Sequence, residues 1–149
     1  MGVLFTYFSA DSDEQAASVI DLEQGPASSP DVRDTVPLKG IEPVVQMGTL
    51  EELLTGRPYD EVTEDPRWAD AVAVRRDGEL LVLTLTDGLT SALAGASESE
   101  LAVAARGWAR TEELDGSDPS LLGLILTDLS GLAQSAAAGQ RRLYCWVCV

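Results

Sequence analysis

Residues 143–149 decide the fold of this protein, and they read Leu143-Tyr144-Cys145-Trp146-Val147-Cys148-Val149. Alternate residues of a strand face opposite sides, so a strand built from this run is apolar on both faces. A strand with two apolar faces is covered on both sides by other parts of the protein. The run therefore predicts a strand at the centre of a sheet, with the rest of the chain arranged around it.

Two further segments have apolar side chains on both faces of an expected strand. Residues 3–8 predict a first strand of this kind. Residues 71–76 and 79–86 flank Asp77-Gly78, a pair typical of a two-residue type I′ turn, and they predict a β-hairpin. Since the first and last strands are both expected to be central, we expect them to be neighbours in one mixed sheet.

The remaining apolar segments are bounded by residues that are typical of helix starts and helix ends. Capping boxes, in which Ser, Thr or Asp precedes Glu by three residues, occur at Asp11, Thr49 and Ser97. Residues 44–47 fit either a short helix or a strand. The many leucines between residues 121 and 132 predict that the first half of the last helix is almost fully buried. We expect helices at residues 12–22, 50–55, 88–95, 98–108 and 119–138.

Residues 24–37 are rich in Gly, Pro and Ser and predict a flexible loop. The segments on either side of it are too short to be separate domains. A chain of 149 residues can form a single hydrophobic core without a metal or a disulfide. The predicted fold class is α+β, with one compact domain over residues 1–149 in which several helices pack on a mixed sheet.

The composition excludes several classes of function. The chain has no histidine, which removes Ser–His–Asp catalysis and histidine-ligated metal sites. Its net charge of −15 argues against binding to nucleic acid or to anionic membranes and favours a basic protein as partner. No secretion signal is recognisable, and no apolar run reaches the roughly 18 residues of a transmembrane helix. We expect a cytoplasmic protein with no cofactor and no metal; the sequence leaves its oligomeric state open.

Cys145 and Cys148 form a Cys-x-x-Cys motif inside the expected terminal strand. Strand positions three apart point to opposite faces and lie about 10 Å apart along the strand. That separation exceeds the roughly 7 Å between Cα atoms that a disulfide allows. The favoured interpretation is two buried structural cysteines. The alternative is a small thiol- or metal-dependent enzyme or redox protein that uses them.

The polar loop over residues 57–68 is the most suggestive candidate for binding. It combines aromatic residues, which dominate protein-binding hot spots, with carboxylates that suit a basic partner or a cation. Other interpretations are a solvated loop with its tryptophan packed into the core, and carboxylate-based catalysis. The candidate partner-binding residues are Tyr59, Asp60, Glu61, Glu64, Asp65 and Trp68.

In layout the chain resembles the YfbM-like family of small uncharacterised bacterial proteins. The likeness rests on Met1-Gly2 before a first strand, on Leu53-Leu54-Thr55-Gly56 at a helix end, and on a helix, glycine and apolar strand over Leu129–Val149. It covers most of the chain and includes one short specific motif. The resemblance implies a compact α/β domain and supplies no catalytic residues.

The leading functional hypothesis is a non-enzymatic acidic protein that acts by protein–protein interaction. Its concrete version is an immunity- or inhibitor-like role against a basic partner. The thiol or metal enzyme is the second hypothesis, and an acidic ligand-binding domain is the third.

Overall fold

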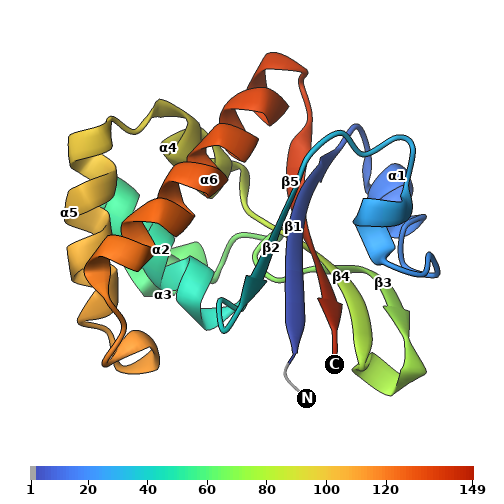
Figure 1. The fold of residues 1–149 in the computed structure, drawn as a ribbon, viewed down its shortest axis with the longest axis horizontal. Helices are drawn as coiled ribbons and strands as arrows, with labels where there is room; N and C mark the ends of the chain where they lie inside the picture. The colour runs from blue at the N-terminus through green and yellow to red at the C-terminus, as the bar shows by residue number, and fades with distance from the viewer. Residues whose placement is uncertain (1–2) are drawn as a thin grey trace.

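The computed structural model describes residues 3–149, so Met1 and Gly2 of the family resemblance lie outside it (Figure 1). The chain forms an α+β domain around a five-stranded sheet of order β2-β1-β5-β4-β3. β5 lies between β1 and β4, which confirms that the last strand is central and that it pairs with the first. The strands are β1 (Leu4–Ala10), β2 (Thr35–Lys39), β3 (Ala71–Arg75), β4 (Leu80–Thr84) and β5 (Arg142–Cys148).

Every neighbouring pair in this sheet is antiparallel, so the expectation of a mixed sheet is wrong. The helices between β4 and β5 pack together as a separate layer and do not cross over the sheet to start a parallel strand. They return the chain to the end at which β4 stops, where Thr84 pairs with Tyr144. β5 therefore runs back alongside β4, in the opposite direction.

The hairpin of β3 and β4 is present, but its turn differs from the expected two-residue type. Strand pairing stops at Arg75 and Leu80, which leaves a four-residue connection. Arg76, Asp77 and Gly78 all have positive φ, at 53°, 56° and 96°. The connection is closed by a hydrogen bond of 3.2 Å from the Glu79 amide to the Arg76 carbonyl, and it forms a short 3₁₀ turn.

The expected loop over residues 24–37 is only partly irregular. It contains a 3₁₀ turn at Gly25–Ser28, and its last three residues begin the edge strand β2. Pro37 lies inside that strand, opposite Thr6 of β1. An edge strand tolerates proline because one side of its backbone has no strand partner that would need the missing amide hydrogen.

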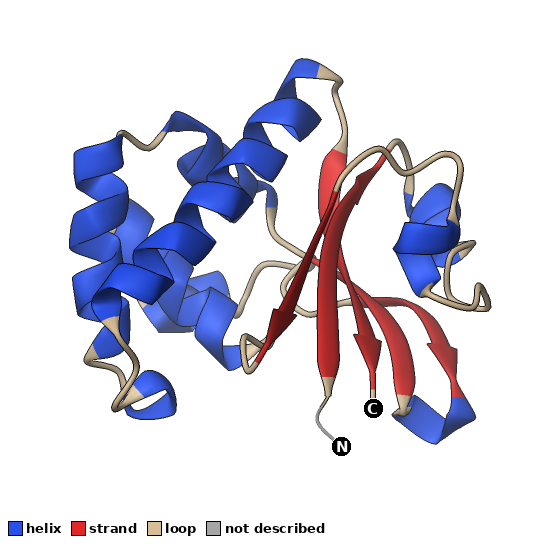
Figure 2. Cartoon of the chain, in the orientation of Figure 1, coloured by secondary structure: helices blue, strands red, loops and turns tan. Residues whose placement is uncertain are grey.

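The sheet has a large helical layer on one face and a small cover on the other, as Figure 2 shows. The large layer packs on Tyr7, Leu83, Cys145 and other apolar side chains. Phe8, Tyr144 and Trp146 belong to the smaller core under α1 (Asp13–Ala17). Both faces of β5 are thus buried, as its sequence predicted. The large layer contains α2 (Val45–Thr55), α3 (Tyr59–Val62), α4 (Asp87–Gly95), α5 (Glu98–Ala109) and α6 (Pro119–Ala138).

Several helix starts differ from the expected positions. The first helix is only five residues long, and Ser12 rather than Asp11 caps it. Residues 44–47 contain the start of α2, so Thr49 is inside that helix and not at its cap. The reason is Glu42, whose carboxylate accepts a hydrogen bond of 2.7 Å from the Val44 amide and another from the Gln46 amide.

Later helix starts follow the sequence more closely. Ser97 and Glu100 form a complete capping box at the start of α5. Asp118 caps α6 through the Ser120 amide, and Pro119 occupies its first turn. Thr86 caps α4, which begins at Asp87, one residue earlier than expected.

The first half of α6 is less buried than its sequence predicted. Leu122 and Leu126 are buried, but Leu121 and Leu124 are 56% and 66% exposed. The neighbours of α6 lie on one side of it only, so its opposite face is open. Among the described residues, α6 is the helix that is long and apolar enough to cross a membrane by length and composition. Of its most apolar 18-residue stretch, 39% is buried. Helices in the cores of other proteins meet the same criterion.

Candidate functional site

The loop over residues 57–68 is folded back onto α2. Gly56 ends α2 with a φ of 78°, in the left-handed region that suits glycine. The short helix α3 begins three residues later, and the Tyr59 amide donates a hydrogen bond of 2.7 Å to the Glu52 carboxylate. This bond fixes α3 against the end of α2. The loop is therefore a positioned surface and contains a turn of helix that the sequence did not predict.

Tyr59 and Trp68 form an aromatic pair at this corner. Their ring centroids are 6.3 Å apart with an interplanar angle of 82°, an edge-to-face arrangement. Both rings rest on Gly48 of α2, where a Cβ atom would lie 2.8 Å from the Tyr59 ring and 3.1 Å from the Trp68 nitrogen. The Trp68 indole also donates to the Val44 carbonyl at 3.1 Å. Both side chains are half-buried, so each keeps an exposed part while its orientation is held.

Carboxylates from three parts of the chain contribute negative charge to the environment of Tyr59. Burial, and after it the negative charges of Glu42, Glu113 and Asp60, raises the pKa of Tyr59 above its ordinary value. Glu42 precedes α2, and Glu113 lies in a 3₁₀ turn after α5. We call Glu42, Tyr59, Asp60, Trp68 and Glu113 the acidic–aromatic surface. The sequence had no local signal for Glu42 and Glu113, because only the packing of α2, α3 and the turn after α5 brings them to Tyr59.

The other predicted carboxylates have different roles. Glu61, in α3, and Glu64, two residues after that helix, are both exposed. Asp65 is half-buried and accepts a hydrogen bond of 2.9 Å from the Arg67 amide, so it stabilises the turn before β3. The structure thus pairs the two predicted aromatic residues, leaves Glu61 and Glu64 exposed, and assigns Asp65 a local structural contact.

The acidic–aromatic surface suits a positively charged side chain. Lysine and arginine bind to the faces of Tyr and Trp rings, and a nearby carboxylate adds a charged hydrogen-bond acceptor. No arginine among the described residues forms an ion pair with Glu42, Asp60 or Glu113. The charges of Asp60 and Glu113 are therefore free to attract a partner, whereas the Glu42 carboxylate already accepts hydrogen bonds from the Val44 and Gln46 amides at the start of α2.

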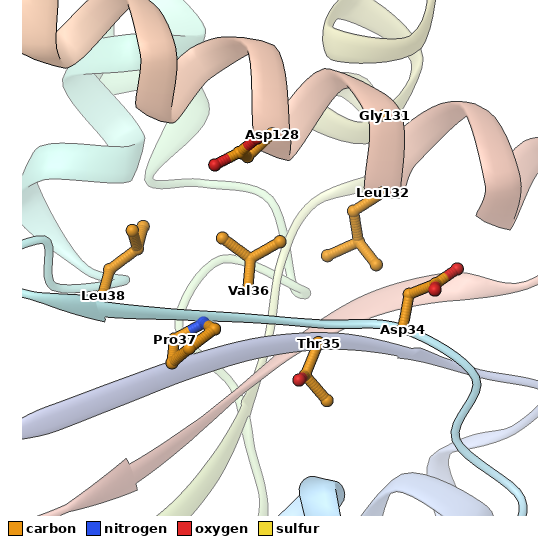
Figure 3. A pocket seen from close by; sticks show the side chains of 8 residues that line it. All are labelled: Asp34, Thr35, Val36, Pro37, Leu38, Asp128, Gly131 and Leu132. Atoms are coloured by element: carbon orange, nitrogen blue, oxygen red, sulfur yellow. The ribbon is translucent and has the colours of Figure 1, made fainter.

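Apart from the acidic–aromatic surface, an acidic hollow lies between the edge strand β2 and α6. Its volume is about 390 Å³. Figure 3 shows Asp128 of α6 above Val36, with Leu132 pointing from the helix toward β2 and Asp34 near the start of the strand. This hollow has two carboxylates over an apolar floor but no aromatic side chain.

Cys145 and Cys148 lie on opposite faces of β5, as their spacing predicted. Cys145 is buried under the helical layer, and Cys148 is half-buried on the α1 side. Burial raises the pKa of the Cys145 thiol well above its ordinary value, so this thiol is not activated. A disulfide between the two would require β5 to break. Within residues 3–149, no group of three or more Cys, Asp or Glu side chains is placed to hold a metal ion.

Glu51 is a buried carboxylate that was not among the candidate residues expected from the sequence. Its side chain is 1% exposed; it accepts a hydrogen bond from the Thr86 hydroxyl and lies 3.4 Å from the Arg57 guanidinium. Burial raises its pKa above the ordinary value, and the bond from Thr86 opposes that rise. Glu51 follows Met47 by four residues and Leu50 by one, so its place on the apolar face of α2 was readable from helical spacing.

Asp13 connects the small cover to the sheet. It accepts a hydrogen bond of 2.6 Å from the Tyr144 hydroxyl and forms an ion pair of 3.2 Å with Arg67. The hydrogen bonds from Arg67 and then Tyr144 lower the pKa of Asp13. Burial, together with the hydrogen bond to Asp13, raises the pKa of Tyr144 to about 12. These bonds hold α1 against β5 and the turn before β3.

No family model, curated protein or solved structure matches this chain. The resemblance to the YfbM-like family therefore stays a prediction. What can be inferred about function comes from the geometry of the chain itself.

Proposed function

We propose that this protein acts without catalysis, by binding a basic protein through the acidic–aromatic surface, in the manner of an immunity or inhibitor protein. The observation that carries the proposal is the half-buried Tyr59 ring, held edge-on to Trp68 and exposed to the negative charges of Glu42, Asp60 and Glu113. Aromatic anchors of fixed orientation with charged neighbours are typical of binding hot spots.

The charge of the whole chain supports a basic partner. A net charge of −15 over 149 residues produces a strong negative potential, which accelerates the approach of a positive surface. Such association is sensitive to ionic strength, because salt screens exposed charges over about 10 Å at 0.1 M. The aromatic pair supplies the local contact that the diffuse charge lacks.

The proposal is tested with a defined basic probe, a synthetic peptide of alternating arginine and glycine, with alternating glutamate and glycine as its charge-reversed control. Two-dimensional ¹H–¹⁵N NMR follows the indole N–H signals of Trp68, Trp108 and Trp146. We expect the arginine peptide to shift the Trp68 signal and leave the signal of the fully buried Trp108 unchanged. The glutamate peptide is expected to shift neither.

A matched pair of double variants separates this surface from net charge alone. Asp60→Asn with Glu113→Gln removes two charges from the acidic–aromatic surface, and Asp34→Asn with Asp128→Asn removes two from the hollow beside β2. We expect the first double variant to weaken binding of the arginine peptide several-fold more than the second. Equal weakening by both, or a Trp68 signal that the peptide leaves in place, contradicts the proposal.

A further inference from the structure

A cleft of about 440 Å³ lies on the other face of the sheet, between the segment after α1 and the ends of β3, β4 and β5. Its volume falls within the roughly 300–1,000 Å³ of small-molecule sites. Its lining combines apolar side chains with charged ones. It includes Ile20, Arg75, Arg76, Leu80, Trp146 and Cys148.

Trp146 is one of the residues that line this cleft, and its indole nitrogen is a buried donor without an acceptor among the described residues. Its side chain is 5% exposed, and its indole nitrogen has no hydrogen-bond partner among the described residues. The other two tryptophans are satisfied, because Trp68 donates to Val44 and Trp108 donates to Gln46, both at 3.1 Å. Buried donors are almost always paired, and an unpaired one is destabilising. The exception among the three indoles is thus the one that lines a cleft of ligand size.

The indole is held in place by close packing from the loop above it. Gly25 approaches so near that a Cβ atom there would lie 2.4 Å from two carbons of the Trp146 ring. Gly25 also has a φ of 57°, which favours glycine. The ring therefore has little freedom to turn toward an acceptor within the protein, and an acceptor has to come to it.

The charges of the cleft leave one arginine free of an ion pair. Arg75 pairs with Asp21 at 3.2 Å across the cleft, which neutralises both. Arg76, the next residue, forms no ion pair within residues 3–149. Glu23 is the remaining acidic group of the lining. Arg76 and the Trp146 indole are thus a cation and a neutral donor that line one cleft, and both suit an anionic oxygen.

We propose that this cleft binds a small carboxylate with an apolar body. The carboxylate accepts hydrogen bonds from the Trp146 indole and from Arg76, and the body packs on Ile20 and Leu80. No covalent step is involved. The cleft lies on the opposite side of the sheet from the acidic–aromatic surface, so this proposal does not depend on the proposed partner.

The test uses hexanoate as the probe, with hexanol and hexylamine as controls of the same chain length. ¹H–¹⁵N NMR again follows the three indole N–H signals. We expect hexanoate to move the Trp146 signal downfield as the indole gains an acceptor, while Trp68 and Trp108 stay in place as internal controls of the fold. A Trp146 signal that hexanoate does not move overturns the proposal, and so do equal shifts with hexanol or hexylamine.

A pair of arginine variants tests the second contact. Arg76→Gln is expected to weaken hexanoate binding roughly tenfold, the effect of losing one hydrogen bond to a charged group. Arg110→Gln changes an exposed arginine that does not line the cleft, and it is expected to leave hexanoate binding unchanged. Equal affinities of the two variants overturn the role of Arg76, and unchanged Trp68 and Trp108 signals in each variant confirm its fold.

Discussion

Replacement of Gly25 by alanine is expected to destabilise the protein through two separable effects. Gly25 has a φ of 57°, and a Cβ atom there would lie 2.4 Å from Cδ2 and Cε2 of Trp146. Trp146 belongs to the buried core under α1 and is fixed within the central strand β5. The clash is therefore with a ring packed in the core under α1, and relieving it requires either a shift of the loop backbone or a movement of the ring toward the cleft that it lines.

The size of the effect follows from the two contributions. A residue with a Cβ atom in the left-handed region costs about 1–2 kcal/mol. Forcing an extra carbon into a packed core costs a further ~1–3 kcal/mol. Gly40→Ala is the matched control, since Gly40 has a φ of 77° and no heavy atom within 4 Å of the position that a Cβ atom would take. We expect Gly25→Ala to lower the free energy of unfolding by about 2–5 kcal/mol. Gly40→Ala is expected to lower it by only about 1–2 kcal/mol, which is the cost of the left-handed backbone conformation.

Urea unfolding followed by far-ultraviolet circular dichroism measures both variants without relying on tryptophan emission. For a domain of this size, each kcal/mol corresponds to roughly 2–4 °C in melting temperature, so thermal unfolding gives an independent value. If Gly25→Ala and Gly40→Ala destabilise the protein equally, the close packing of Gly25 on Trp146 is refuted. The fixed position of the Trp146 indole, on which the proposed carboxylate site depends, is then refuted as well.

Three further predictions concern ionisable groups and thiols. Burial raises the pKa of Glu51 above its ordinary value of 4.5, so ionisation of this group destabilises the folded state. In urea titrations, Glu51→Gln is therefore expected to gain stability relative to the wild type as pH rises from about 4 to about 7. The pKa of Asp13 is lowered from 3.8, so its contribution to the free energy of unfolding is present above that pH and is lost as pH falls below it. Asp13→Asn is expected to reduce the loss of stability at acid pH. An unchanged loss of stability contradicts the role of the Arg67 contact. Cys148 is expected to react with a thiol reagent in the folded protein, whereas Cys145 should react only in denaturant, and rapid labelling of both would show that β5 opens.

Much of the fold could be predicted from local sequence. The apolar run over residues 143–149 predicted a central strand because burial on both faces requires apolar residues at successive positions. The capping box of Ser97 and Glu100 and the Asp118-Pro119 start were predicted correctly, since a helix cap involves neighbours in sequence. The start of α2 was predicted wrongly because its capping group, Glu42, comes from further upstream.

The candidate sites depended on contacts that are distant in sequence. The polar loop with Tyr59 and Trp68 was recognisable from its residue types, but the approach of Glu113 was not. Likewise the Cys-x-x-Cys motif predicted two sulfur atoms on opposite faces, while the unpartnered indole of Trp146 between them had no sequence signature.

The sequence by itself determined the α+β class, the central place of β5 and the acidic character of the chain, because these follow from periodicity and composition. Only the tertiary structure decided that the sheet is antiparallel, that the charges of three carboxylates act on Tyr59, and that Trp146 and Arg76 share a cleft. The physical reason is that the periodicity of apolar residues and the charge are properties of short segments of sequence. The neighbours of a side chain across a sheet or between helices are set by strand order and packing, which depend on the whole chain at once.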